Sequence, residues 1–469
     1  MKRTGLRRRA VWLLILAAVI ACRVFPAAAD GETDFMDTWG FCVTGLDLLR
    51  EAAEKDERLQ APVTVAVIDT GCDTGHEIFR GRISEDSRSY YGKEDDISNP
   101  DGHGTSVASI IAAATPANVK LLILKVGENK QYASDEQFEE AIEYALEKGA
   151  DVINFCISVP DNKPLPQDYR PWHEGIRRCR EAGVPFVCGA GNDSTDASRA
   201  YPAADRNAIA VSAVTIHGKL SDISNYGESV RFSAPGTWIR VARSGTKDEY
   251  MYSGGTSLAA PHVTAAIAYI KMLHPDWNWE QTVEALRSCA VKPEAAGGEK
   301  APAEMPEISR LLLEQAPSVS LRMIPELTWL TATGGNADEG PENLFDGDPD
   351  TKWCLHFSGT AFAEWKTEQP VAPSAILLTT ANDNLQYPGR NPEKMILQGR
   401  NGPEEEWKTL WEQEPGQQLP DRNYAGCVFR FPEPEEAYSC FRLMINATGG
   451  SDVLQMSMIE LVGCRVDGG

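Results

Sequence analysis

A nearly continuous apolar run at residues 63–68 ends in the carboxylate of Asp69. Such a run is typical of a strand that is buried on both faces of a parallel sheet, and ligands gather at the carboxyl ends of such strands. Further strand-like runs at 119–126, 151–158 and 184–188 alternate with helix-like segments. Strands separated by helices predict an α/β fold whose sheet is mostly parallel and flanked by helices.

The character of the sequence changes after residue 292. Residues 293–319 are rich in proline, glycine and scattered charges, which is typical of a linker. Short alternating or apolar runs separated by turn residues follow, and they predict an antiparallel β-sandwich at 320–466. The α/β domain is predicted at 62–292, after a short N-terminal segment at 30–61.

The first 29 residues have the pattern of an export signal. Basic residues precede an apolar run at 10–21, and alanines at 27–29 offer a cleavage site. The run is shorter than the roughly 20 residues that a spanning helix needs, which disfavours a permanent anchor. The protein is therefore expected to be secreted. The alternative is a lipoprotein signal, in which a lipid on Cys22 would tether the protein to the cell surface.

Charge and cysteine content narrow the classes of partner. The net charge of −23, from 45 basic and 68 acidic residues, disfavours nucleic acid and anionic membranes as partners. Of the 11 cysteines, ten remain after removal of the export signal; export would permit disulfides among them, but their spacing does not define the pairing. Cys156 and Cys188 lie inside apolar strand-like runs, where buried free thiols are expected.

Four residues stand where side chains are accessible at the ends of elements. Ser257 follows two glycines and opens an apolar helix-like run, so that free N–H groups and the positive end of the helix dipole would face a reacting group. His103 lies between two glycines at another helix start, Asn192 follows the strand at 184–188, and Asp69 ends the first strand. Each alone could be an ordinary cap or turn residue. Together they supply the nucleophile, base, orienting carboxylate and oxyanion donor that acyl transfer from a peptide needs.

A family resemblance rests on four strings in register, namely Val-Ile-Asp-Thr-Gly at 67–71, Gly-His-Gly-Thr-Ser at 102–106, Ala-Gly-Asn at 190–192 and Gly-Thr-Ser-Leu-Ala-Ala-Pro-His-Val at 255–263. With them, residues 36–292 resemble the subtilisin-like serine peptidases, for which the order Asp, His, Ser is known. The resemblance implies that Ser257 attacks the scissile carbonyl, His103 accepts its proton and Asp69 orients the imidazole. It also implies that Asn192 and the Ser257 N–H stabilise the oxyanion, and that catalysis needs no cofactor.

The resemblance further implies polypeptide substrates that bind extended near Gly127 and near Phe155, Cys156, Ile157 and Ser158. The string Phe155–Ser158 departs from the Met-Ser-Leu-Gly that is common in the family, so cleavage specificity is not predicted. His76 and His262 match family positions and are interpreted as structural. The 32 residues at 30–61 are too few for the long propeptide of many secreted relatives, which leaves the activation route open.

In the C-terminal part, the segment 340–353 and the string Ile459-Glu460-Leu461 resemble discoidin or galactose-binding-like domains. In that family such a loop and late glutamate often hold a structural calcium ion, and the candidate ligands here are Asp346, Asp348, Thr351 and Glu460. The domain could bind a cell-surface glycan through aromatics such as Trp365 or Tyr387, or it could be a stabilising spacer.

The sequence thus predicts a secreted serine endopeptidase. The alternative is a catalytically silent surface adhesin or glycan-binding protein that keeps the peptidase fold as a scaffold.

Overall fold

The structure, a computed structural model, describes residues 39–158, 170–291, 302–311, 322–323, 325–432, 434 and 436–465. The chain divides into a first unit, Phe35–Ile324, and a second unit that contains Pro325–Gly469. The predicted export signal at 1–29, including Cys22, lies outside the described residues, as do residues 293–301 and 312–319 of the predicted linker. No helix in the described ranges is long and apolar enough to cross a membrane.

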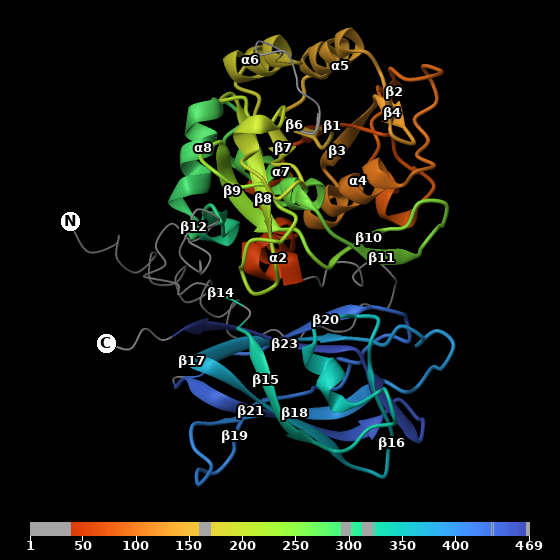
Figure 1. Ribbon diagram of the computed structural model, residues 1–469, viewed down its shortest axis with the longest axis vertical. Coiled ribbons are helices and arrows are strands. Elements are labelled where there is room, and N and C mark those ends of the chain that lie inside the picture. Colours follow the sequence, from red (N-terminus) through yellow and green to blue (C-terminus); the bar gives the residue numbers. More distant parts are fainter. Residues whose placement is uncertain are drawn as a thin grey trace, which may run out of the picture. The chain divides into compact units, whose positions relative to one another are not determined.

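A seven-stranded sheet forms the centre of the first unit, in the order β2-β3-β1-β6-β7-β8-β9 (Figure 1). All neighbouring strands in it are parallel. The predicted mostly parallel sheet is confirmed, and its apolar strands are almost wholly buried. The strands are β1 Val63–Asp69, β2 Arg88–Ser89, β3 Val119–Lys125, β6 Val152–Phe155, β7 Phe186–Gly189, β8 Ala208–Val214 and β9 Val230–Pro235.

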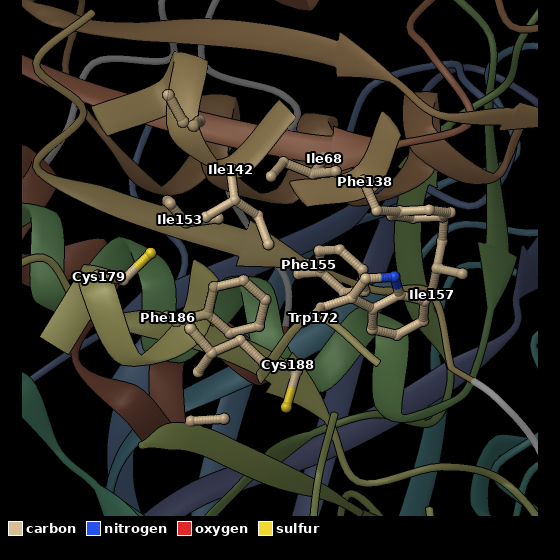
Figure 2. Packing of buried hydrophobic residues seen from close by; sticks show 14 of the residues in the cluster. Ile68, Phe138, Ile142, Ile153, Phe155, Ile157, Trp172, Cys179, Phe186 and Cys188 are labelled. Atoms are coloured by element: carbon tan, nitrogen blue, oxygen red, sulfur yellow. The ribbon is translucent and has the colours of Figure 1, made fainter. Parts of the chain in front are cut away.

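Helices cover both faces of this sheet (Figure 1). On one face, α5 (Asp135–Glu147) and α6 (His173–Glu181) pack on the strands, and α5 begins with a capping box at Ser134 and Gln137. Figure 2 shows the centre of this core, where the rings of Phe138, Phe155, Trp172 and Phe186 lie together.

On the other face lie α4 (His103–Ala114) and α7 (Thr256–Leu273), which contact each other and the strands. The side chain of Asn154 on β6 points to this face, because it accepts a hydrogen bond from Thr264 on α7. Two opposite faces of the same strands are therefore covered, which is the reason that the strands are apolar on both sides.

Shorter elements complete the first unit. Residues 302–311, which composition placed in a linker, pack on the first unit. Met305–Pro306 pairs with Ala290–Val291, and the Glu304 carbonyl accepts a hydrogen bond from the Ser233 N–H at 2.9 Å.

The remaining elements of the first unit are α2 Trp39–Thr44, α3 Leu46–Ala53, η1 Glu57–Gln60, η2 Glu77–Phe79, β4 Gly127–Glu128, β5 Gln131–Tyr132, η3 Ala197–Arg199, β10 Ile239–Ala242, β11 Tyr250–Ser253, α8 Trp279–Ser288, β12 Ala290–Val291, β13 Met305–Pro306, η4 Ile308–Leu311 and β14 Arg322–Met323.

The second unit is built from antiparallel strands around one long strand, β17 (Ala361–Thr379). Its first half pairs with β15 and β21, and its second half pairs with β20 and β23. Trp353 and Trp365 are fully buried in the core. The other elements are β15 Leu327–Ala332, η5 Pro341–Phe345, β16 Trp353–His356, β18 Pro392–Arg400, β19 Lys408–Glu412, β20 Gly426–Arg430, β21 Tyr438–Thr448, β22 Val453–Met456 and β23 Met458–Arg465.

Candidate active site

Ser257 is the second residue of α7, at the carboxyl-end edge of the parallel sheet. The helix is preceded by Gly255, whose φ of 133° is a conformation that favours glycine. Because Ser257 lies in the first helical turn, its N–H has no partner within the helix. The half-buried Ser257 side chain donates a long hydrogen bond of 3.5 Å to the carbonyl of Cys156.

His103 and Asp69 form a hydrogen-bonded pair. Nδ1 of His103 lies 2.6 Å from Oδ1 of Asp69, whose side chain is 1% exposed. The Asp69 carboxylate raises the pKa of His103 above its usual value, although burial of the imidazole opposes this effect. A buried carboxylate that holds Nδ1–H leaves Nε2 of the ring as the atom that can exchange a proton.

No hydrogen bond joins the described side chains of Ser257 and His103, since the hydroxyl is directed to Cys156. Catalytic hydrogen bonds are often long or poorly aligned in ligand-free proteins and tighten when substrate binds. The structure therefore brings Asp69 and His103 into contact and positions Ser257 at a helix start without a direct bond to the base.

A network of polar side chains fixes the backbone that carries His103. Asp101 accepts hydrogen bonds from Thr70 Oγ1, from Asn99 Nδ2, and from the N–H groups of His103 and Asn129, at 2.8, 2.8, 3.1 and 2.9 Å. Burial raises the pKa of Asp101, but these hydrogen bonds have the larger combined effect and lower it below its usual value. The charged carboxylate thus ties the His103 loop to the end of β1.

Asn192 lies directly after β7 and its side chain is exposed. Its Oδ1 accepts a hydrogen bond from the Thr256 N–H at 2.9 Å, so that Nδ2 is the group left to donate to a ligand. Thr256 in turn accepts a hydrogen bond from the Gly191 N–H at 3.2 Å. These two contacts connect the loop after β7 with the start of α7.

Sequence reasoning missed the residues that support this arrangement. Asn225, which is fully buried, holds the Asn192 loop by accepting from the N–H groups of Asp193 and Thr195 and by donating to the Ala190 carbonyl, at 3.0, 3.1 and 3.0 Å. Asn99 plays the same part for the His103 loop, where it also bonds Thr70 and Thr105. These partners lie far away in sequence or outside any motif, so no local signal marks them.

Of the predicted substrate-binding residues, Ser158 is exposed and the others are buried. The side chains of Phe155 and Ile157 belong to the core against α5 and α6 and are 0% and 6% exposed. They can reach a substrate only through their backbone. Gly127 is covered by the ring of Tyr132 on the paired strand β5. Cys156 is 9% exposed and contacts Ser257.

The site therefore has the groups of a serine hydrolase that acts on acyl compounds. These are a hydroxyl at a helix N-terminus, an imidazole oriented by a buried carboxylate, and an accessible amide donor at the edge of a parallel sheet. Comparison with known proteins supports the same class of enzyme. The model of the subtilase family (Peptidase_S8) matches residues 60–318, and the chain belongs to this family. It is a serine endopeptidase.

Curated relatives are similar to this chain over slightly less than half of its length. The major intracellular serine protease of Bacillus subtilis (strain 168) is 37% identical over 230 residues, which cover 45% of this chain and 68% of that protein. The intracellular serine protease of Paenibacillus polymyxa is 31% identical over 247 residues, which cover 49% of this chain and 72% of that protein.

Solved structures share the fold. A lanthipeptide protease matches with a TM-score of 0.51 and 20% identity over 61% of this chain and 96% of its own. A protease from Pseudoalteromonas arctica PAMC 21717 matches with a TM-score of 0.52 and 21% identity, over 62% of this chain and 100% of its own.

In the second unit, three of the four predicted calcium ligands lie close together, namely Asp346, Asp348 and Thr351. The Thr351 hydroxyl donates to Asp346 Oδ2 at 2.8 Å, and Asp346 Oδ1 accepts from the Asp348 N–H at 2.8 Å. Glu460 is buried, with 5% of its surface exposed, and its Oε2 has no hydrogen-bond partner among the described residues. That orphaned oxygen would suit a cation, but the described residues contain no group of three or more His, Cys, Asp or Glu side chains that could hold one. The four residues do not make a ready ligand set, and the calcium site stays a prediction.

Two further predictions can be compared with the structure. Trp365 is 0% exposed, so it cannot be an exposed glycan-binding aromatic; its ring fills the core beside Phe345 and Phe441. Tyr387 is 39% exposed, with the Arg390 guanidinium 4.0 Å from its ring centre. The prediction that Cys156 and Cys188 are buried free thiols is confirmed.

Proposed function

We propose that this endopeptidase is secreted and hydrolyses peptide bonds with Ser257 as nucleophile, His103 as general base and acid, and Asp69 as the orienting carboxylate. The observation that carries the proposal is the 2.6 Å hydrogen bond from His103 to the buried Asp69. It fixes the ring so that Nε2 is the basic nitrogen, which is the state that a serine nucleophile needs.

In the proposed reaction, the Ser257 hydroxyl leaves the Cys156 carbonyl and transfers its proton to His103 Nε2 as Oγ bonds to the scissile carbonyl carbon. The carbonyl oxygen becomes an oxyanion that accepts hydrogen bonds from Asn192 Nδ2 and the Ser257 N–H. His103 then gives the proton to the leaving amine as the C–N bond breaks. Water hydrolyses the acyl-enzyme by the same proton path in reverse and restores Ser257.

In this structure the Ser257 hydroxyl bonds the Cys156 carbonyl and not His103, so the proposed activation of Ser257 calls for a direct test. A fluorophosphonate probe provides it, since it reacts only with an activated serine. We expect one equivalent of label on Ser257 at neutral pH, no label on Ser257→Ala, and wild-type labelling of Ser253→Ala, a serine four positions away on β11. Intact wild-type protein that takes up no label would refute the enzymatic proposal.

Cys156 also lies at the site, and its thiol could be imagined as the nucleophile. Burial, with a further effect from the Asp69 carboxylate, raises the pKa of the Cys156 thiol well above its usual value. A protonated thiol is a poor nucleophile. The Ser257→Ala protein should therefore gain no peptidase activity from the Cys156 thiol.

Secretion is proposed from the export pattern of residues 1–29. Mass spectrometry of the protein from culture medium should find an N-terminus at Asp30. A lipidated Cys22 in the membrane fraction, abolished by Cys22→Ser, would instead support the tethered form.

For the second unit we propose a galactose-binding-like accessory module, on the strength of its antiparallel strands and of the loop at 340–353. A glycan array with the full-length Ser257→Ala protein tests whether it binds carbohydrate. Binding that is lost in Tyr387→Ala would favour a glycan module, and no binding would favour a spacer.

A further inference from the structure

The carbonyl of Ser257 lacks its normal helical partner. In an α-helix this oxygen accepts from the N–H four residues later, which here is position 261. That residue is Pro261, which lies inside α7 and has no N–H to donate. The nucleophile is thus attached to a peptide group whose acceptor must be satisfied from outside the helix.

Cys156 supplies the missing donor. Its Sγ lies 3.4 Å from the Ser257 carbonyl oxygen, within reach of an S–H···O hydrogen bond. The same sulfur accepts from Asn154 Nδ2 at 3.3 Å, so that the thiol proton is free to point at Ser257. Asn154 is itself fixed, because its Oδ1 accepts from Thr264 Oγ1 at 2.8 Å. This chain of hydrogen bonds starts in the third turn of α7, passes through the end of β6, and returns to the first turn of α7.

The contact between Cys156 and Ser257 is reciprocal. The thiol of Cys156 donates to the Ser257 carbonyl, and the hydroxyl of Ser257 donates to the Cys156 carbonyl at 3.5 Å. Asn154 and Thr264 are 0% exposed and Cys156 is 9% exposed, so water competes little for these groups. The end of β6 and the start of α7 are therefore joined at the point where both face the substrate.

We propose that the Cys156 thiol is a positioning residue for the nucleophile, holding the Ser257 peptide in place by replacing the hydrogen bond that Pro261 cannot make. This role rests on the proposed function of Ser257. The same peptide carries both the attacking Oγ and one oxyanion N–H, and small displacements of such groups are costly in rate. The thiol acts through Ser257 and does not touch the reacting atoms.

The test compares Cys156→Ala, which removes the donor, with Cys156→Ser, which restores one. Cys188→Ala is the matched control: Cys188 is a fully buried thiol on the neighbouring strand β7, packed in the core with α5 and α6 and without a hydrogen bond to α7. For each protein we would measure kcat, KM, the rate of fluorophosphonate labelling and the thermal midpoint.

We expect kcat and the labelling rate of Cys156→Ala to fall together by about 3- to 10-fold, the range of one net hydrogen bond, with KM within about twofold. Cys156→Ser should recover most of this loss, and Cys188→Ala should change the thermal midpoint without changing kcat. Unchanged kcat and labelling in Cys156→Ala, or equal losses in Cys188→Ala, would overturn the inference while wild-type labelling still supports the peptidase. An unlabelled wild type would instead refute the proposed function itself.

Discussion

Replacing Glu460 by glutamine should stabilise the second unit at neutral and alkaline pH but not at pH 4. Glu460 lies on β23 and is 5% exposed, and its Oε2 has no hydrogen-bond partner among the described residues. Burial raises the pKa of this carboxyl from 4.5 to about 8. The folded protein therefore keeps Glu460 protonated at neutral pH, whereas the unfolded chain ionises it.

The size and sign of the effect follow from the two pKa values. Because the folded value is the higher one, the stability that the neutral carboxyl contributes is fully present below pH 4.5 and is lost as the pH rises through about 8. One pKa unit corresponds to about 1.4 kcal/mol, so the whole span is on the order of 5 kcal/mol. Glutamine has a similar shape and no charge, so the Glu460→Gln protein avoids this loss.

Urea unfolding between pH 4 and 9 checks this, in the Ser257→Ala background to prevent self-digestion. Hydrogen exchange of the β23 peptide assigns the transition to the second unit. Glu368→Gln, at an exposed position on β17, is the control and should leave the pH dependence unchanged. A wild-type curve as flat as that of Glu460→Gln would refute the reasoning. So would stabilisation of the wild type alone by millimolar calcium at pH 8, because an ionised, metal-bound Glu460 would then be the native state.

Three predictions concern the first unit. Asn192→Ala should lower kcat by about 10²–10³-fold, the range known for such a donor in subtilisin, with little change in KM in steady-state assays. Asp69→Asn should lower kcat on the order of 10⁴-fold. It should also move the acid limb of the kcat/KM profile to lower pH, because the Asp69 carboxylate raises the pKa of His103. An acid limb that stays at the same pH would contradict this cause. Burial lowers the pKa of His262 from 6.5 to about 4, so stability is lost as the pH falls from 6.5 to 4. His262→Gln should remove this loss, on the order of 3 kcal/mol, in acid unfolding curves.

The parts of the fold that could be predicted are those with a local physical signature. The apolar run before Asp69 predicted a buried parallel strand, and the glycines before Ser257 predicted a helix N-terminus. Each signal lies within a few residues, where burial and capping act on the chain directly.

What escaped prediction depends on contacts between distant segments. Proline and glycine content placed 302–311 in a linker, yet this stretch docks on the first unit through strand pairing, through hydrogen bonds to Ser233 and Cys289, and through the buried side chain of Ile308. Trp365 was a candidate for an exposed glycan-binding aromatic, yet it lies in the core, because strand alternation does not say which face is buried until the partner sheet is known.

The start of α7 is held by groups from two strands, and this arrangement explains how a helix N-terminus can be rigid and still open to a ligand. Asn192 caps the Thr256 N–H, Thr256 Oγ1 holds the Gly191 N–H, and Cys156 meets the Ser257 carbonyl that Pro261 leaves without a partner. All three contacts fix the peptide groups on either side of Ser257 while leaving its own N–H without a helical partner. In the proposed reaction this N–H donates to the oxyanion, so its neighbours hold that one donor in place before a substrate binds.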